Sequence, residues 1–232
     1  MSQYNVLDLS RAEVDERTFI SQVYLWMATA LVVTAIVAAA IATDTRLVVE
    51  IVTSPLFWVL LIGELALVFV LGLFINRMSA AAATITFFGY AALNGVTLSM
   101  IFLIFTDASI TSTFLVTAGT FGLMSAYGYF TKRDLTSWRN LLFMGLIGFI
   151  IASVVNLFFN SSTVYWIITY GGILVFVGLT AYDTQKIKRM ASGGVMSNEQ
   201  ERKASILGAL TLYLDFINLF LLLLRVLGGR RN

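Results

Sequence analysis

The 232-residue chain contains no cysteine and no histidine. The absence of cysteine excludes disulfides, thiol chemistry and cysteine-ligated metals. The absence of histidine removes the side chain that ordinarily titrates near neutral pH. A response of this protein to pH near neutrality must therefore come from carboxyl groups whose titration is shifted by the protein around them.

Charge and proline are also scarce. Only 12% of the residues are charged, against about 25% in a typical soluble protein. The formal net charge is +2 and there is no long polybasic tract, so the sequence predicts no nucleic-acid partner. The single proline, Pro55, stands where a helix is expected to begin, a position that tolerates proline.

Long apolar stretches dominate the chain, which is 59% hydrophobic. A helix needs about 20 apolar residues to cross the hydrocarbon core of a bilayer, and backbone groups in lipid must hydrogen-bond within the segment. The sequence therefore predicts an all-α integral membrane protein with one transmembrane domain, residues 22–228, and the lipid bilayer as its surroundings. Its seven helices are expected at about 22–42, 56–75, 81–105, 110–130, 140–159, 164–182 and 205–224.

Two segments outside these stretches are polar. Residues 1–21 are predicted to form a polar N-terminal tail, and residues 185–204 a polar loop that is mobile or contains a short amphipathic piece. The N-terminal side of the membrane receives 11 basic residues and the other side 4, which are Arg46, Arg225, Arg230 and Arg231. Because basic residues favour cytoplasmic loops, the N-terminus and the 185–204 loop are expected in the cytoplasm. The basic C-terminal tail argues against this, since seven spans place it outside.

Three acidic residues fall within or at the end of a predicted span. Glu64 is half-way along the second span, Asp183 ends the sixth, and Asp215 is about ten residues into the seventh. A charge at the centre of a bilayer costs about 2.5–3.5 kcal/mol on insertion scales, so such residues usually face the bundle interior or water and have a partner. Asp215 is therefore expected to face away from lipid. For Glu64, a protonated glutamic acid that only packs is a competing interpretation.

Polar and small residues recur at helical spacing in several spans, and so share one face of each helix. Ordinary helix–helix packing in membranes uses the same residue types, so these faces alone do not indicate a function. They are Gly208, Thr211, Asp215 and Asn218 in the seventh span; Thr86, Tyr90, Asn94 and Thr97 in the third; and Thr113, Thr117, Thr120 and Tyr127 in the fourth.

Three segments resemble a known family. GLTAYDTQKIK (178–188) and LGALTLYLDFINLFLLLLR (207–225) are similar to the C-terminal signature of the Bax inhibitor-1 family, the transmembrane Bax inhibitor motif proteins. AYGYFTKRDLTS (126–137) resembles that family's loop between the fourth and fifth spans. The resemblance covers about residues 20–228 and is greatest to the bacterial members.

The resemblance implies a seven-helix bundle with the last helix at its centre, in the bacterial plasma (inner) membrane. It also implies a pH-sensitive leak of calcium, with Asp183 and Asp215 as the pH sensor and with Glu64 and Asp215 on the ion path. Asn218, on the face of Asp215, is assigned to the same path, and Arg77 is the candidate latch for the sensor. Calcium is expected as the transported ion, held transiently by the two aspartates. No resident cofactor and no catalytic residue are expected.

Three alternatives remain open. The family resemblance also implies a stress-related regulator that binds a membrane-bound ATP-dependent protease, through the N-terminal tail or the 185–204 loop. An intramembrane aspartyl protease would likewise have two aspartates on its sixth and seventh helices, the first after a tyrosine, as Asp183 follows Tyr182. Such enzymes have a glycine-containing motif before the second aspartate, whereas Leu212–Leu214 contains none. A proton-coupled carrier is the third alternative.

Overall fold

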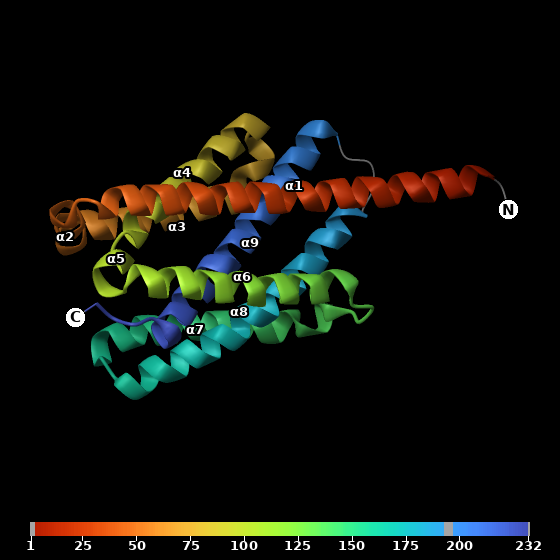
Figure 1. The fold of residues 1–232 in the computed structure, drawn as a ribbon. Coiled ribbons are helices and arrows are strands. Elements are labelled where there is room, and N and C mark those ends of the chain that lie inside the picture. Colours follow the sequence, from red (N-terminus) through yellow and green to blue (C-terminus); the bar gives the residue numbers. More distant parts are fainter. Residues whose placement is uncertain (1–2, 193–196, 232) are drawn as a thin grey trace. The chain divides into compact units, whose positions relative to one another are not determined.

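The computed structural model describes residues 3–192 and 197–231, with side chains from residue 15 onward. In this part the chain is helical and has no strand beyond one isolated bridge between Phe105 and Arg230 (Figure 1). The elements are α1 (Gln3–Ala42), α2 (Thr45–Thr53), α3 (Leu56–Phe74), η1 (Ile75–Arg77), α4 (Ala80–Leu98), α5 (Ile101–Ile104), α6 (Asp107–Phe130), η2 (Leu135–Trp138), α7 (Arg139–Phe159), α8 (Ser162–Ala191) and α9 (Asn198–Leu227).

The prediction of a helical integral membrane protein is confirmed. The described residues contain six helical segments long and apolar enough to cross a membrane: Asp15–Ala42, Leu56–Arg77, Ala80–Ile104, Leu135–Phe159, Ser162–Ala191 and Asn198–Leu227. The 24 residues of α6 have sufficient length as well, but its threonines, serines and glycines make it less apolar. In chain order, the seven predicted stretches correspond to α1, α3, α4 with α5, α6, α7, α8 and α9.

Both predicted polar segments differ from the structure, because hydropathy does not distinguish a polar loop from a polar helix. The tail assigned to residues 1–21 is helical from Gln3, as part of an unbroken α1 (Figure 1), since no glycine or proline interrupts residues 3–42. The predicted loop 185–204 is helical at both ends, because α8 runs to Ala191 and α9 begins at Asn198. Acidic residues in the first turn of α9 favour its early start. Residues 193–196 of that loop lie outside the described residues.

The chain divides into two compact units, each of which is described by itself. The first unit comprises the residues up to 104 together with 187–213, and the second comprises 105–186 together with the residues from 214 onward. In the first unit α1 lies directly against α4: a Cβ added at Gly95 would be 2.7 Å from the carbonyl oxygen of Thr34. In the second unit α6 and α8 touch at the backbone, since a Cβ at Gly128 would overlap the carbonyl oxygen of Ala181. Small residues thus allow close helix contact in both units.

The last helix is the most enclosed of the candidate spans. In the apolar 18-residue stretch of this helix, 67% of the residues are buried, against 44% or less in the corresponding stretches of the other five candidate spans. In the second unit, α9 packs on α7 and α8 through a core of Leu142, Phe176, Leu179, Leu219 and Leu222. The high burial of α9 agrees with the prediction that other helices surround it.

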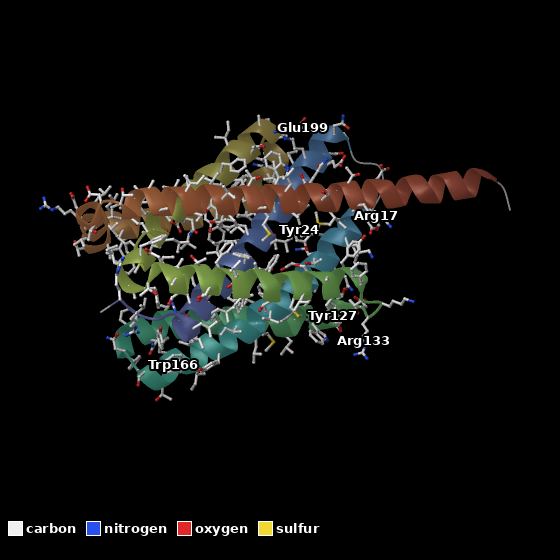
Figure 2. The ribbon with its side chains drawn as sticks, viewed as in Figure 1. Arg17, Tyr24, Tyr127, Arg133, Trp166 and Glu199 are labelled. Atoms are coloured by element: carbon white, nitrogen blue, oxygen red, sulfur yellow. The ribbon has the colours of Figure 1, made fainter. Side chains whose placement is uncertain are left out.

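The C-terminal residues are held beside the start of α6, within the second unit. The backbone N–H of Gly229 donates to Ser109 Oγ (2.9 Å), and the N–H of Thr106 donates to the carbonyl oxygen of Gly229 (3.1 Å). Figure 2 shows Arg133, which follows α6, and Trp166, near the start of α8, at opposite ends of this unit. The C-terminus and the α6–α7 connection therefore lie at opposite ends of α6.

Candidate functional site

In the second unit, the structure brings together the two predicted sensor aspartates, Asp183 on α8 and Asp215 on α9. Both are buried, with 7% and 5% of their surface exposed, and their carboxyl groups are close enough to interact electrostatically. Lys186, one turn after Asp183, places its Nζ 3.9 Å from Asp183 Oδ1. Oδ2 of Asp215 is buried and has no hydrogen-bond partner among the described residues. The aspartate pair thus combines two acids, one cation and one unoccupied acceptor atom.

The charges of the aspartate pair do not balance when both acids ionise. Lys186 supplies a single positive charge, and its side chain is 55% exposed, so water screens much of its interaction with Asp183. Two carboxylates near each other in a medium of low dielectric repel, and ionising the second costs more than ionising the first. Asp183 and Asp215 are therefore expected to exchange protons as one coupled group.

Glu64 belongs to a separate hydrogen-bond network in the first unit. Its carboxyl group accepts from Asn94 Nδ2 at Oε2 (3.1 Å) and from Thr97 Oγ1 at Oε1 (2.7 Å), two residues one turn apart on α4. Tyr213 of α9 donates its hydroxyl to Asn94 Oδ1 (3.0 Å) and lies 2.7 Å from Thr34 Oγ1 of α1. This network, called the Glu64 network below, joins α1, α3, α4 and α9. Both oxygens of the buried Glu64 carboxyl group have a donor.

The Glu64 network is expected to stabilise the first unit, which Thr97→Val tests. The substitution keeps the shape but removes the hydroxyl, leaving Glu64 Oε1 buried without its donor. Side-chain hydrogen bonds in membranes are worth up to about 1.7 kcal/mol, so we expect a loss of about 1–2 kcal/mol in the free energy of unfolding. The readout is the apparent melting temperature in detergent.

Thr86→Val on the same helix is the matched control, since Thr86 bonds the carbonyl oxygen of Ala82 in its own helix. We expect it to change the melting temperature little. Equal melting temperatures for the two variants would contradict a stabilising role for the Glu64 network.

The other two predicted site residues, Asn218 and Arg77, have different surroundings, each within its own unit. Asn218, assigned to the ion path, is half-buried and donates its Nδ2 to the carbonyl oxygen of Leu214 in its own helix (2.8 Å). Arg77, the candidate latch, is exposed at the end of η1 in the first unit. Within the second unit the cation beside Asp183 is Lys186. The latch role of Arg77 and the path role of Asn218 stay predictions.

The carboxyl groups alone make a sparse metal site. Among the described residues there is no group of three or more histidine, cysteine, aspartate or glutamate side chains that could hold a metal ion. Calcium prefers about six to eight oxygen ligands. A calcium ion at Asp183 and Asp215 would thus keep most of its water, which suits an ion in transit better than a resident one.

Sequence reasoning missed several of these contacts. Lys186 is three residues from Asp183, a spacing that permits an ion pair on a helix, but the sequence alone does not show that the pair forms. Gln185 was not singled out, and nothing in the sequence marks it. Its side-chain oxygen accepts from the N–H of Leu135 (2.9 Å) and its Nε2 donates to the carbonyl oxygen of Arg133 (2.8 Å). Gln185 therefore fixes the α6–α7 connection to α8, next to the aspartate pair.

Comparison with known proteins agrees with this architecture. A family model described as "Inhibitor of apoptosis-promoting Bax1" matches residues 16–232. The chain belongs to the Bax inhibitor-1 family. The match to the family model includes all but the first residue of the candidate membrane helices, together with the aspartate pair and the Glu64 network, and it confirms the resemblance found in the three segments.

Proteins of several bacteria are similar to the chain over nearly its whole length. It is 52% identical over 217 residues to the inner membrane protein YbhL of Escherichia coli K12, covering 93% of each chain. It is 45% identical over 221 residues to the protein RP147 of Rickettsia prowazekii, covering 93% of this chain and 91% of that one. A protein of Deinococcus radiodurans is 43% identical over 230 residues, covering 99% and 96%.

Proposed function

We propose that the protein is a pH-sensitive cation leak channel of the bacterial inner membrane, with calcium favoured, gated by the aspartate pair. The observation that carries the proposal is the pair itself: Asp183 and Asp215 are buried and close enough to interact electrostatically, with one partly hydrated cation and one acceptor atom without a partner among the described residues. Charged groups inside a membrane protein ordinarily mark ion or proton pathways. The name of the relative YbhL supports the inner membrane as the location.

Protonation is proposed to switch the aspartate pair between two arrangements. With one proton on the pair, the two carboxyl groups can share it and stay together. When that proton leaves, the carboxylates repel and attract a cation, either calcium or the ammonium of Lys186. Calcium binds carboxylate oxygens readily, and a site with few protein ligands releases the ion again. Glu64 and Asn218 are proposed as further oxygen-bearing points on the path, and Arg77 as the candidate latch for the sensor aspartates.

The proposal assigns the aspartates no enzymatic role. A protease would need to bring a substrate backbone next to Asp215. The residues directly before Asp215, Leu212–Leu214, contain no glycine that would let a substrate backbone approach closely. Calcium enters as the transported ion, and the chain's own residues neither break nor form a covalent bond.

Calcium flux into dye-loaded liposomes that contain the purified protein tests the proposal. The rate of calcium entry should exceed that of empty liposomes and should differ between acidic and alkaline pH. Calcium loaded inside the liposomes beforehand should not accelerate this entry. Flux equal to that of empty liposomes at every pH would overturn the channel. Saturable counterflow would instead indicate a proton-coupled carrier.

A second candidate function is regulation of a membrane-bound ATP-dependent protease. The length of α1 favours it: the helix has 40 residues, about twice the number needed to cross a bilayer. Its polar N-terminal half, including Glu16, is therefore free to project from the membrane, where it meets the end of α8 through Lys188 (3.8 Å). Deletion of residues 1–18 that leaves flux intact but removes a co-purifying protease would support this role.

The N-terminus and the α6–α7 connection are proposed to lie in the cytoplasm, with the C-terminus outside. Because the chain has no cysteine, single cysteines give a clean test. Ser137 and Ser162 are exposed residues at the two ends of α7. A membrane-impermeant maleimide added to intact cells should label Ser162→Cys and spare Ser137→Cys. The reverse labelling would invert the topology, and labelling of both would contradict α7 as a span.

A further inference from the structure

Two buried hydroxyl groups on α6 differ from most helical hydroxyl groups that the structure describes. Serine and threonine within helices usually donate to the carbonyl oxygen one turn back, and many do so here: Thr29, Thr53, Thr84, Thr86, Thr117, Ser153, Thr169, Thr180 and Thr211. Ser125 Oγ and Thr113 Oγ1 are instead buried with no hydrogen-bond partner among the described residues. Such atoms lose several kcal/mol of hydration unless a protein group, water or ion binds them.

Ser125 lies on α6 between contacts to α9 and α8, the two helices that carry the aspartate pair. One turn before it, Phe121 packs against Phe216 of α9, with ring centroids 5.4 Å apart. One turn after it, Gly128 touches the backbone of Ala181 on α8. Phe121, Ser125 and Gly128 share the buried face of α6. Phe216, the contact on α9, is the residue after Asp215. Ala181, the contact on α8, lies two residues before Asp183.

The atoms without partners are complementary. Oδ2 of Asp215 is a buried acceptor and Ser125 Oγ is a buried donor, and both lie in the second unit. They are too far apart to bond directly, since neither has a partner within hydrogen-bond distance. Buried waters typically bridge polar groups of this kind with two to four hydrogen bonds.

We propose that Ser125 Oγ and Asp215 Oδ2 bind the same ordered water molecule, which makes Ser125 the third side chain of the aspartate-pair site. The water donates to the carboxyl oxygen and accepts from the serine hydroxyl. A cation that reaches Asp215 would displace this water and take the serine oxygen as a neutral ligand. This last step rests on the proposed channel function, whereas the hydrated site itself does not.

Infrared difference spectroscopy of the full-length protein in lipid tests the site independently of transport. Acidification gives a carboxyl C=O band for Asp215, identified by its loss in Asp215→Asn. Because a hydrogen bond lowers the C=O frequency, Ser125→Ala should move this band to higher frequency, and Ser125→Thr should restore it. Thr113→Val is the matched control, since it removes the other buried hydroxyl of α6 without a partner among the described residues, about three turns away. This substitution should leave the band of Asp215 at its wild-type frequency.

The outcomes separate the site from the channel. An Asp215 band that is the same in Ser125→Ala and wild type, or that moves equally in Thr113→Val, would overturn the shared water. A band that moves only in Ser125→Ala, in a protein that passes no calcium, would leave the hydrated site standing and contradict the channel. If Ser125→Ala does not fold, Ser125→Gly and Ser125→Cys give the same comparison.

Discussion

Asp215→Asn is expected to flatten the pH dependence of calcium flux, so that the ratio of rates at acidic and alkaline pH approaches one. Asparagine has nearly the shape of aspartate but cannot ionise, which removes the second charge of the coupled pair and its exchangeable proton. Asp183 would then keep the ammonium group of its neighbour Lys186 beside it. The measurement is the initial rate of dye-reported calcium entry into proteoliposomes over a series of pH values.

Asp107→Asn is the matched control for this measurement. Asp107 is an exposed aspartate in the first turn of α6, in the same unit, and its removal changes the net charge by the same amount. It should leave both the rate and its pH dependence close to wild type. A pH dependence that survives in Asp215→Asn would contradict the sensor role of Asp215, and a dependence lost in both variants would indicate an effect of net charge alone.

The positions of the spans and the burial of the acids can both be predicted from the sequence, because both follow from the free-energy cost of placing polar groups in lipid. Apolar stretches of about 20 residues locate the helices, and an acid inside such a stretch must avoid lipid. Glu64 and Asp215, predicted on this ground, are both buried in the structure. Pro55 also precedes α3 as predicted.

The partners of the acids could not be predicted, since a sequence gives the face of each helix but not which faces meet. Asn94 and Thr97 lie on the polar face predicted for the third span, yet only the packing of α3 on α4 brings them to Glu64. The hydroxyl of Tyr213 bonds Asn94, a contact that the sequence of the last span does not indicate. Helical polar segments were missed for a different reason: outside the membrane a charged helix and a charged loop have the same hydropathy.

Gly128→Ala is expected to have the largest effect on stability in the second unit. The added Cβ would overlap the carbonyl oxygen of Ala181, and a backbone atom cannot rotate away as a side chain can. To admit one methyl group, α6 and α8 must separate along their whole contact. Overpacking of this kind costs typically about 1–3 kcal/mol, and we expect the upper end because backbone meets backbone. The apparent melting temperature in detergent and the yield of folded protein report the loss.

The same helix provides the control, Gly122→Ala, where a Cβ meets nothing within 4 Å. Alanine there should stabilise α6 slightly, by up to about 1 kcal/mol, since glycine is the poorer helix former. A Gly128→Ala variant as stable as Gly122→Ala would contradict the backbone contact.

Ala181 lies two residues before Asp183, so α8 cannot move away from α6 without moving a member of the aspartate pair. Where Gly128→Ala still folds, its calcium flux should therefore depend on pH differently from wild type, while Gly122→Ala keeps the wild-type profile.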